Sequence, residues 1–177
     1  CIHIYEPEGH DLERRRGETQ WLDKIKNALS NGRFCLYFQP IISLAEPDTK
    51  NMHVEILIRM LDDDNNVIPP MAFLPVAERY MLMPQIDRKN VLATISSQIL
   101  GNNHEWPSDR NYLFNINLSG ESIANQDLLS TVQQLLTRYH VPAHVICFEI
   151  TESVAISNLE NARNFIDAMR NLGCKFA

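Results

Sequence analysis

The segment HVEILIRM at residues 53–60 decides the fold, because the chemistry of its side chains alternates. One set is β-branched and apolar, as is typical of a buried strand face, and consists of Val54, Ile56 and Ile58. Glu55 and Arg59 fall on the other face, since the side chains of a strand point to alternate sides. The segment therefore predicts a strand that packs on one side and carries charged groups on the other.

Three other segments repeat this alternation: FCLYFQPII at 34–42, YLFNINLS at 112–119 and VICFEIT at 145–151. Each has an apolar face and an opposite face with an oxygen-bearing side chain near its C-terminal end. These side chains are Gln39, Asn117 and Glu149, in that order. All four strands thus have one apolar face and a polar side chain on the other, and we expect these polar side chains to converge.

Helical patterns separate most of these strands, at residues 10–31, 71–80, 86–100, 125–139 and 158–172. Strands that alternate with amphipathic helices predict βαβ units and a parallel sheet. No glycine-rich phosphate-binding motif follows any strand, so a dinucleotide-binding fold has no support. In a parallel barrel the apolar faces would meet the ring of helices, and the polar ends would meet at the C-terminal mouth, where such barrels place their sites.

The composition is that of one sizeable globular domain: 177 residues, of which 45% are hydrophobic and 21% charged. The net charge of −6 argues against a nucleic-acid polymer as partner, but it allows an anionic small ligand that binds through metal ions. The scattered cysteines predict reduced thiols, and no apolar run approaches the ~20 residues of a membrane span. We expect a cytoplasmic protein whose membrane tether, if it has one, lies outside this sequence.

Glu55 and Glu149 are predicted to face the same space, where two carboxylates need a cation or a shared proton. A single polar residue of this kind is usually structural, but three strands that repeat the pattern favour a site. Two carboxylates and the amide of Asn117, with no converging histidine or cysteine, suit Mg²⁺ or Mn²⁺. Arg59 could reach a phosphate. These residues indicate phosphate-ester chemistry.

Five motifs occur in the order found in bacterial EAL domains, which the chain therefore resembles over about residues 33–177. They are YFQPIISL, EILIR, PPMAFLPVAE, NINLS and FEITES. Ile56 stands where the family's name motif has alanine, a position that varies in the family. The resemblance implies an α/β fold of the TIM-type (β/α)8 barrel class, with only its N-terminal part in this chain and a D-D-F-G strand expected after residue 177.

The resemblance also implies an activity, which is hydrolysis of cyclic di-GMP to linear pGpG by two Mg²⁺ or Mn²⁺ ions. It assigns metal binding to Glu55, Asn117 and Glu149, and it places Glu152 beside Glu55 and Glu149 among the catalytic carboxylates. The dinucleotide would be lined by Gln39, Leu57, Arg59 and Asn117, with Arg59 near a phosphate. By the same resemblance, an EAL domain without the Asp-Asp pair would instead be a cyclic di-GMP receptor or a protein-interaction module.

The N-terminal residues resemble the end of a GGDEF-type domain and its connection to the EAL domain. On that resemblance we expect residues 1–8 to be the last strand of an upstream GGDEF-like domain, 9–32 to be a linker helix, and 33–177 to be the EAL domain. A tandem GGDEF–EAL protein, able to form a homodimer, is the expected parent. Alone, the 177 residues are expected neither to fold stably nor to hydrolyse cyclic di-GMP.

Overall fold

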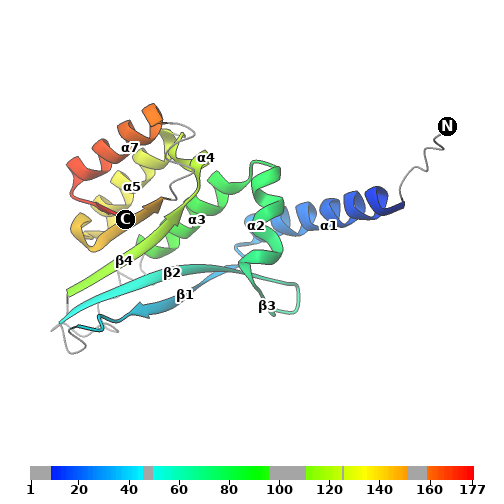
Figure 1. The fold of residues 1–177 in the computed structure, drawn as a ribbon, viewed down its shortest axis with the longest axis horizontal. Helices are drawn as coiled ribbons and strands as arrows, with labels where there is room; N and C mark the ends of the chain where they lie inside the picture. Colours follow the sequence, from blue (N-terminus) through cyan, green and yellow to red (C-terminus); the bar gives the residue numbers. More distant parts are fainter. Residues whose placement is uncertain (1–8, 46–49, 96–110, 125, 151–158) are drawn as a thin grey trace, which may run out of the picture.

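The computed structural model describes residues 9–45, 50–95, 111–124, 126–150 and 159–177. Its centre is an open sheet in which the strands lie in the order β1-β2-β4-β5-β6, with β3 paired to β2 (Figure 1). The strands are β1 (Phe34–Ile41), β2 (Asn51–Leu61), β3 (Val67–Ile68), β4 (Asn111–Leu118), β5 (Ile146–Ile150) and β6 (Lys175–Phe176).

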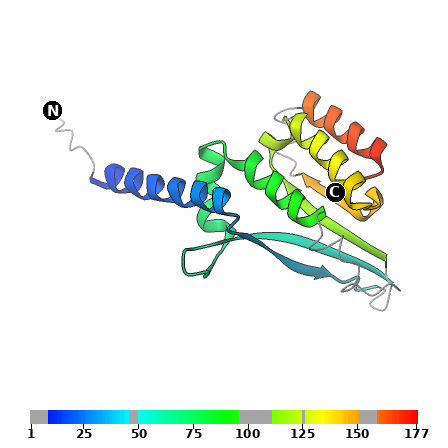
Figure 2. The same ribbon diagram turned by 180° about the vertical axis from the view of Figure 1, so that it is seen from behind.

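The main helices are α1 (Gly9–Asn31), α2 (Pro70–Arg79), α3 (Met83–Ile95), α5 (Gln126–Tyr139) and α7 (Leu159–Leu172). Two elements are short: α4 (Gly120–Ile123) directly follows β4, and the 3-10 helix η2 (Ala143–Val145) directly precedes β5. Figure 2 shows α3, α5 and α7 side by side over one face of the sheet, while α1 extends away from it. The predicted strands and helices are confirmed to within a few residues where their ends are described, and the last five residues of the helix predicted at 86–100 lie outside the described residues.

The predicted division of the strands into two faces is confirmed for β2, β4 and β5, whereas Phe38, on the expected apolar face of β1, is 42% exposed. Val54, Ile56, Phe114 and Phe148 are each at most 2% exposed, and they belong to one apolar cluster with side chains of α3, α5 and α7. Fully burying a side chain of this size contributes about 1.5–3 kcal/mol. The free energy gained by burying these side chains determines which face of the sheet the helices cover. The alternate residues of the strands therefore point to the opposite face.

The prediction of an all-parallel sheet is wrong for β1. β2, β4, β5 and β6 are parallel, but β1 runs antiparallel to β2. Only residues 42–50 connect β1 to β2, and a parallel connection needs a crossover of about a dozen residues or more. A direct return is the connection that this length allows. A further strand, β3, pairs antiparallel with the end of β2.

A second apolar cluster joins the C-terminal half of α1 to the rest of the molecule. Ile25 and Ala28 of α1 are buried together with Met60 of β2, Phe73 of α2 and Ile86 of α3. The apolar stripe in the sequence of this helix thus finds a partner within the chain. Residues 21–29 therefore pack as part of the domain, although they lie inside the segment expected to be a linker.

Candidate functional site

Polar side chains from four strands form a row across the uncovered face of the sheet. Gln39 of β1 lies opposite Glu55 of β2 in the antiparallel register. Asn117 of β4 donates a hydrogen bond from Nδ2 to Oε1 of Glu55 over 3.0 Å, and Glu149 of β5 is the register partner of Asn117. The structure therefore brings together the four polar residues that the strand patterns selected. We call them the polar row.

The register explains why these residues meet although β1 is antiparallel. Parallel pairing between β2 and β4 ends at Ile56 and Ile116, so Glu55 lies at the C-terminal end of the parallel part of β2. Gln39 reaches the row because its strand returns along β2, and not because the C-terminal ends of parallel strands share one edge. Its predicted position is confirmed, but the expected reason for that position is corrected.

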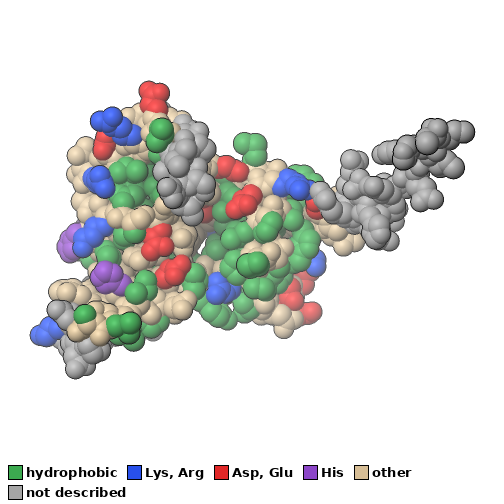
Figure 3. Space-filling view, in the orientation of Figure 1, with side chains coloured by type: hydrophobic (Ala, Val, Ile, Leu, Met, Phe, Trp, Pro, Cys, Tyr) green, Lys and Arg blue, Asp and Glu red, His purple; other side chains and the backbone are tan. Residues whose placement is uncertain are grey.

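The residues of the row are accessible rather than sealed in the core. Gln39 and Asn117 are exposed, and Glu55 and Glu149 are partly buried. In Figure 3, acidic side chains gather on both sides of a hollow in the middle of the visible face. The row can therefore receive a ligand from solvent, as a binding site must.

Arg59 and Leu57 continue the same face of β2 beyond Glu55. Leu57 lies opposite Tyr37 of β1. The Arg59 guanidinium stacks over the Tyr37 ring at 5.0 Å from its centroid, and its Nη1 donates to the carbonyl oxygen of Ile58 at 2.9 Å. Stacking on an aromatic ring holds a guanidinium in place while its remaining N–H groups stay available to an anion. The predicted contact between Arg59 and a phosphate stays a prediction.

The donor set of the row fits a hard divalent cation. Glu55 and Glu149 supply carboxylate oxygens as possible metal ligands. Asn117 uses its Nδ2 for the hydrogen bond to Glu55, so its Oδ1 could coordinate a metal as well. On the same strand face, Oδ1 of the buried Asn115 finds no hydrogen-bond partner within the part of the chain that is described. The described residues thus do not satisfy every polar group on this face.

The predicted site is only partly covered by the structure. Glu152 lies outside the described residues. Among the residues that are described, no three His, Cys, Asp or Glu side chains come close enough together to hold a metal ion. The expected ligands Glu55, Asn117 and Glu149 would not form such a group, because the amide of Asn117 is not one of these four residue types.

A buried carboxylate that the strand patterns did not select binds the segment just after β4. Asp87 of α3 is 4% exposed, and its Oδ2 accepts hydrogen bonds from the Ser119 backbone N–H at 2.8 Å and the Ser122 hydroxyl at 2.6 Å. Burial raises the pKa of Asp87, and the hydrogen bonds from the two serines oppose that rise. Helical spacing from Ile86 and Val91 puts Asp87 on the buried face of α3, so the sequence did contain a signal.

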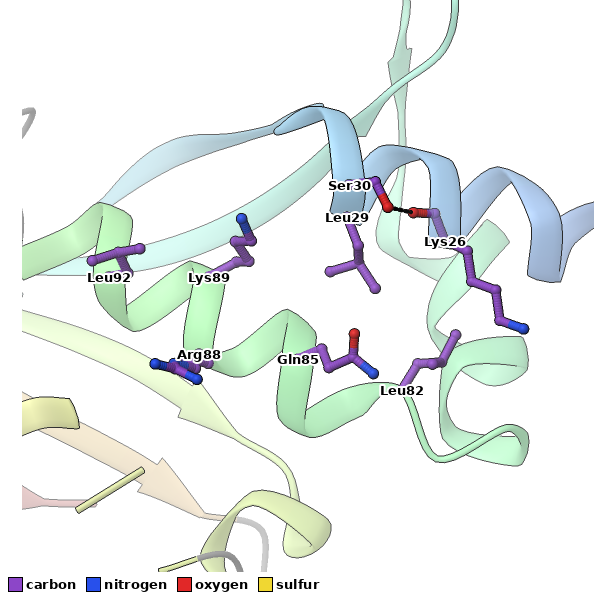
Figure 4. A pocket seen from close by; sticks show the side chains of 8 residues that line it. All are labelled: Lys26, Leu29, Ser30, Leu82, Gln85, Arg88, Lys89 and Leu92. Atoms are coloured by element: carbon purple, nitrogen blue, oxygen red, sulfur yellow. Dashed lines mark hydrogen bonds between the residues drawn. The ribbon is translucent and has the colours of Figure 1, made fainter. Parts of the chain in front are cut away.

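A groove of about 690 Å³ lies on the other side of the molecule, between α1 and α3 (Figure 4). Lys26, Arg88 and Lys89 line it together with three leucines. Figure 4 shows the Lys26 side chain extending away from Lys89, so these cations do not converge on one point. The groove contains no residue of the polar row.

Comparison with known proteins gives consistent matches. The sequence profile of the family described as "EAL domain" matches residues 22–177. A cyclic di-GMP phosphodiesterase of Shewanella oneidensis, PdeB, is 31% identical over 99% of this chain, and Escherichia coli PdeF, also named a cyclic di-GMP phosphodiesterase, is 32% identical over 92%. The chain spans only 20% and 21% of the lengths of these two relatives.

Solved structures match the fold as well. The FimX EAL domain of Xanthomonas citri, in complex with cyclic di-GMP, superposes with a TM-score of 0.79 at 24% identity, covering 94% of this chain and 62% of that one. The FimX EAL domain of Pseudomonas aeruginosa, also bound to cyclic di-GMP, gives 0.76 at 27% identity, covering 88% and 60%. The described residues contain no helix long and apolar enough to cross a membrane.

Proposed function

Because the chain belongs to the EAL domain family, we propose that a protein containing it hydrolyses cyclic di-GMP to linear pGpG. The observation that carries this proposal is the hydrogen bond between Asn117 and Glu55, with Glu149 in register beside them. It supports a common site for the three proposed metal ligands. The names of the two sequence relatives support the substrate and the reaction.

Some residues of the proposed site would bind the dinucleotide, and others would position the metal ligands. Asn117 holds the Glu55 carboxylate in one orientation through its Nδ2. Arg59, fixed on the Tyr37 ring, would bind a phosphate of the dinucleotide, while Gln39 and Leu57 would line its bases or sugars. A catalytic role for Glu152 is proposed from the family motif alone.

Glu55, Asn117 and Glu149 would hold the divalent ions, which we propose to be two Mg²⁺ or Mn²⁺. Ions bound there would lower the pKa of a water molecule and neutralise charge on the phosphate. Carboxylates are suited to this task because each brings negative charge as well as an oxygen ligand. The partly buried positions of Glu55 and Glu149 would keep these ligands ordered.

The test is hydrolysis by the full-length protein in Mg²⁺ or Mn²⁺, with pGpG followed by chromatography. Glu55→Ala is expected to lose roughly 10²-fold or more in turnover, since an interaction worth about 2.7–4 kcal/mol in the transition state corresponds to that factor. Glu160→Ala, at an exposed position in the first turn of α7, is the matched control and should retain wild-type turnover. Wild-type turnover by Glu55→Ala would refute the proposed role.

The alternative function is that of a receptor. An EAL domain that binds cyclic di-GMP without cleaving it would use the same face of the sheet, and the exposure of Gln39 and Asn117 is compatible with both functions. Equilibrium binding in EDTA, combined with the hydrolysis assay, separates the two. Tight binding without any pGpG, in the presence of either metal, would favour the receptor.

Three further proposals rest on the resemblance alone. They are an upstream GGDEF-like domain ending at residues 1–8, a linker helix at 9–32 before the EAL domain at 33–177, and a homodimeric parent in the bacterial cytoplasm. The proposed linker overlaps residues 22–32 of the family match and the part of α1 that packs on the domain. The first eight residues lie outside those described. The sequence that precedes residue 1 in the parent tests the first proposal directly.

A further inference from the structure

Asp87 is the one described acidic residue that is almost fully buried, and it binds the segment that follows β4, which begins two residues after Asn117. A carboxylate at 4% exposure is costly unless hydrogen bonds compensate for the lost water. The Ser119 backbone N–H and the Ser122 hydroxyl both donate to the same oxygen, Oδ2, and both come from the segment that follows β4. The carboxylate thus ties α3 to that segment.

The segment that Asp87 binds is a compact turn. Ser119 is the N-cap residue of α4, and its Oγ accepts the Ser122 backbone N–H at 3.3 Å. The two serine hydroxyls are also 3.0 Å apart. Figure 1 shows α4 directly at the end of β4 and beside α3. Asp87 therefore completes a network that closes the C-terminal end of β4.

This turn begins two residues after Asn117. Asn117 is exposed, so packing does little to restrict its side chain, and its hydrogen bond to Glu55 depends on the position of the backbone. Leu118, 5% exposed, anchors the strand from the other face. Fixing the Ser119 N–H from α3 determines how the backbone leaves β4, and hence where the Asn117 amide points.

We infer that Asp87 is a positioning residue, which fixes the C-terminal end of β4 and thereby holds the Asn117 amide against Glu55. The inference rests on the function proposed above for Asn117, which Asp87 itself does not touch. Removing the partners that orient a metal ligand typically lowers metal affinity or activity by about 10–100-fold. An effect of that size separates positioning from general support of the fold.

The experiment compares Asp87→Ala with Asp87→Asn and Thr94→Ala in the full-length protein. The asparagine keeps an oxygen where Oδ2 stands, so it can still accept from both serines. Thr94 is 0% exposed in the same helix, and among the described residues its hydroxyl donates only to the carbonyl oxygen of Asn90, so Thr94→Ala controls for loss of a buried polar group. Ser122→Ala removes the hydrogen bond from the Ser122 hydroxyl to Asp87 and is the variant to use if Asp87→Ala does not fold.

Two measurements are made on each variant: amide hydrogen exchange in the segment 117–123, and the affinity for Mn²⁺ by calorimetric titration. We expect Asp87→Ala to speed exchange there at least tenfold and to weaken Mn²⁺ binding about 10–100-fold. Asp87→Asn should have an exchange rate and an Mn²⁺ affinity close to those of the wild type. Thr94→Ala should change neither the exchange rate in this segment nor the Mn²⁺ affinity. Equal effects of Asp87→Ala and Thr94→Ala would overturn the inference, as would faster exchange in Asp87→Ala with unchanged Mn²⁺ affinity.

Failure of the proposed function gives a different result. If the wild type bound no Mn²⁺ and released no pGpG, the proposed metal role of Asn117 would be refuted, and the inference about Asp87 would fall with it. If the wild type binds Mn²⁺, the exchange and affinity data decide the role of Asp87 alone.

Discussion

Phe148 and Glu149 are neighbours on β5, and their replacement by alanine tests the division of the sheet into a structural face and a functional face. Phe148 is fully buried, with its ring centroid 6.3 Å from that of Phe165 and 5.9 Å from that of Phe176. Glu149 is partly buried on the opposite face, in register with Asn117. Two adjacent substitutions should therefore have opposite consequences.

The magnitudes follow from burial. Phe148→Ala removes a ring packed on all sides and should cost about 3–5 kcal/mol of the free energy of unfolding. Such a loss is a large share of the about 5–15 kcal/mol that stabilises a typical domain. Glu149→Ala takes away no core packing, and its effect should stay within about 0.5 kcal/mol, as at most surface positions.

The assay is urea unfolding of the full-length protein, followed by intrinsic fluorescence, together with Mn²⁺ titration of the folded variants. Phe148→Ala should unfold at a lower urea concentration but, where folded, bind Mn²⁺ normally. Glu149→Ala should unfold like the wild type and lose Mn²⁺ affinity. The reasoning is refuted if Glu149→Ala is the more destabilising change, or if it binds Mn²⁺ as tightly as the wild type.

Further predictions concern a thiol, a helix end and the isolated chain. Burial raises the pKa of Cys174 to about 11, so at pH 8 its thiolate should be roughly a hundredfold scarcer than at the ordinary value of 9.0, and iodoacetamide should label it correspondingly more slowly than in urea. The neutral thiol is the favoured form in the folded state, so its contribution to stability is complete below pH 9 and is lost as the pH rises through about 11; equal labelling rates with and without urea would contradict this. Gly173 ends α7 with a φ of +100°, so Gly173→Ala should lower the unfolding free energy by about 1–2 kcal/mol. Gly17→Ala, within α1 where an added Cβ meets nothing within 4 Å, should instead raise it by about 0.5–1 kcal/mol; thermal unfolding compares the two, and matching changes would refute the role of φ. The isolated 177-residue chain exposes Tyr37, Phe38 and Ile41 along the edge strand β1, so we expect it to self-associate on a sizing column and to release no pGpG; a monomer that turns over cyclic di-GMP would contradict this.

The two-faced strands could be predicted from sequence because the side-chain period of a strand is two and the apolar residues in them are strongly β-branched or aromatic. Val54, Ile56, Phe114 and Phe148 identify the buried face without reference to any other element. The position of the polar row followed from the same parity, so Glu55, Asn117 and Glu149 could be selected before the fold was known.

Other features depend on chain connections and contacts that side-chain periodicity does not encode. The direction of β1 is set by the length of its connection to β2, and the pairing of β3 by the turn after β2, where Asp62 accepts the backbone N–H groups of Asp64 and Asn66. The role of Asp87 becomes visible only when α3 lies beside the end of β4, since its partners are the distant Ser119 and Ser122.

A crystal of the complete EAL domain grown with Mn²⁺ and measured at an anomalous wavelength gives the most direct test. We predict an anomalous peak within about 2.0–2.6 Å of oxygen atoms from Glu55, Asn117 and Glu149 together. A peak that contacts neither carboxylate, or carboxyl groups of Glu55 and Glu149 that point to opposite sides of the sheet, would contradict the account.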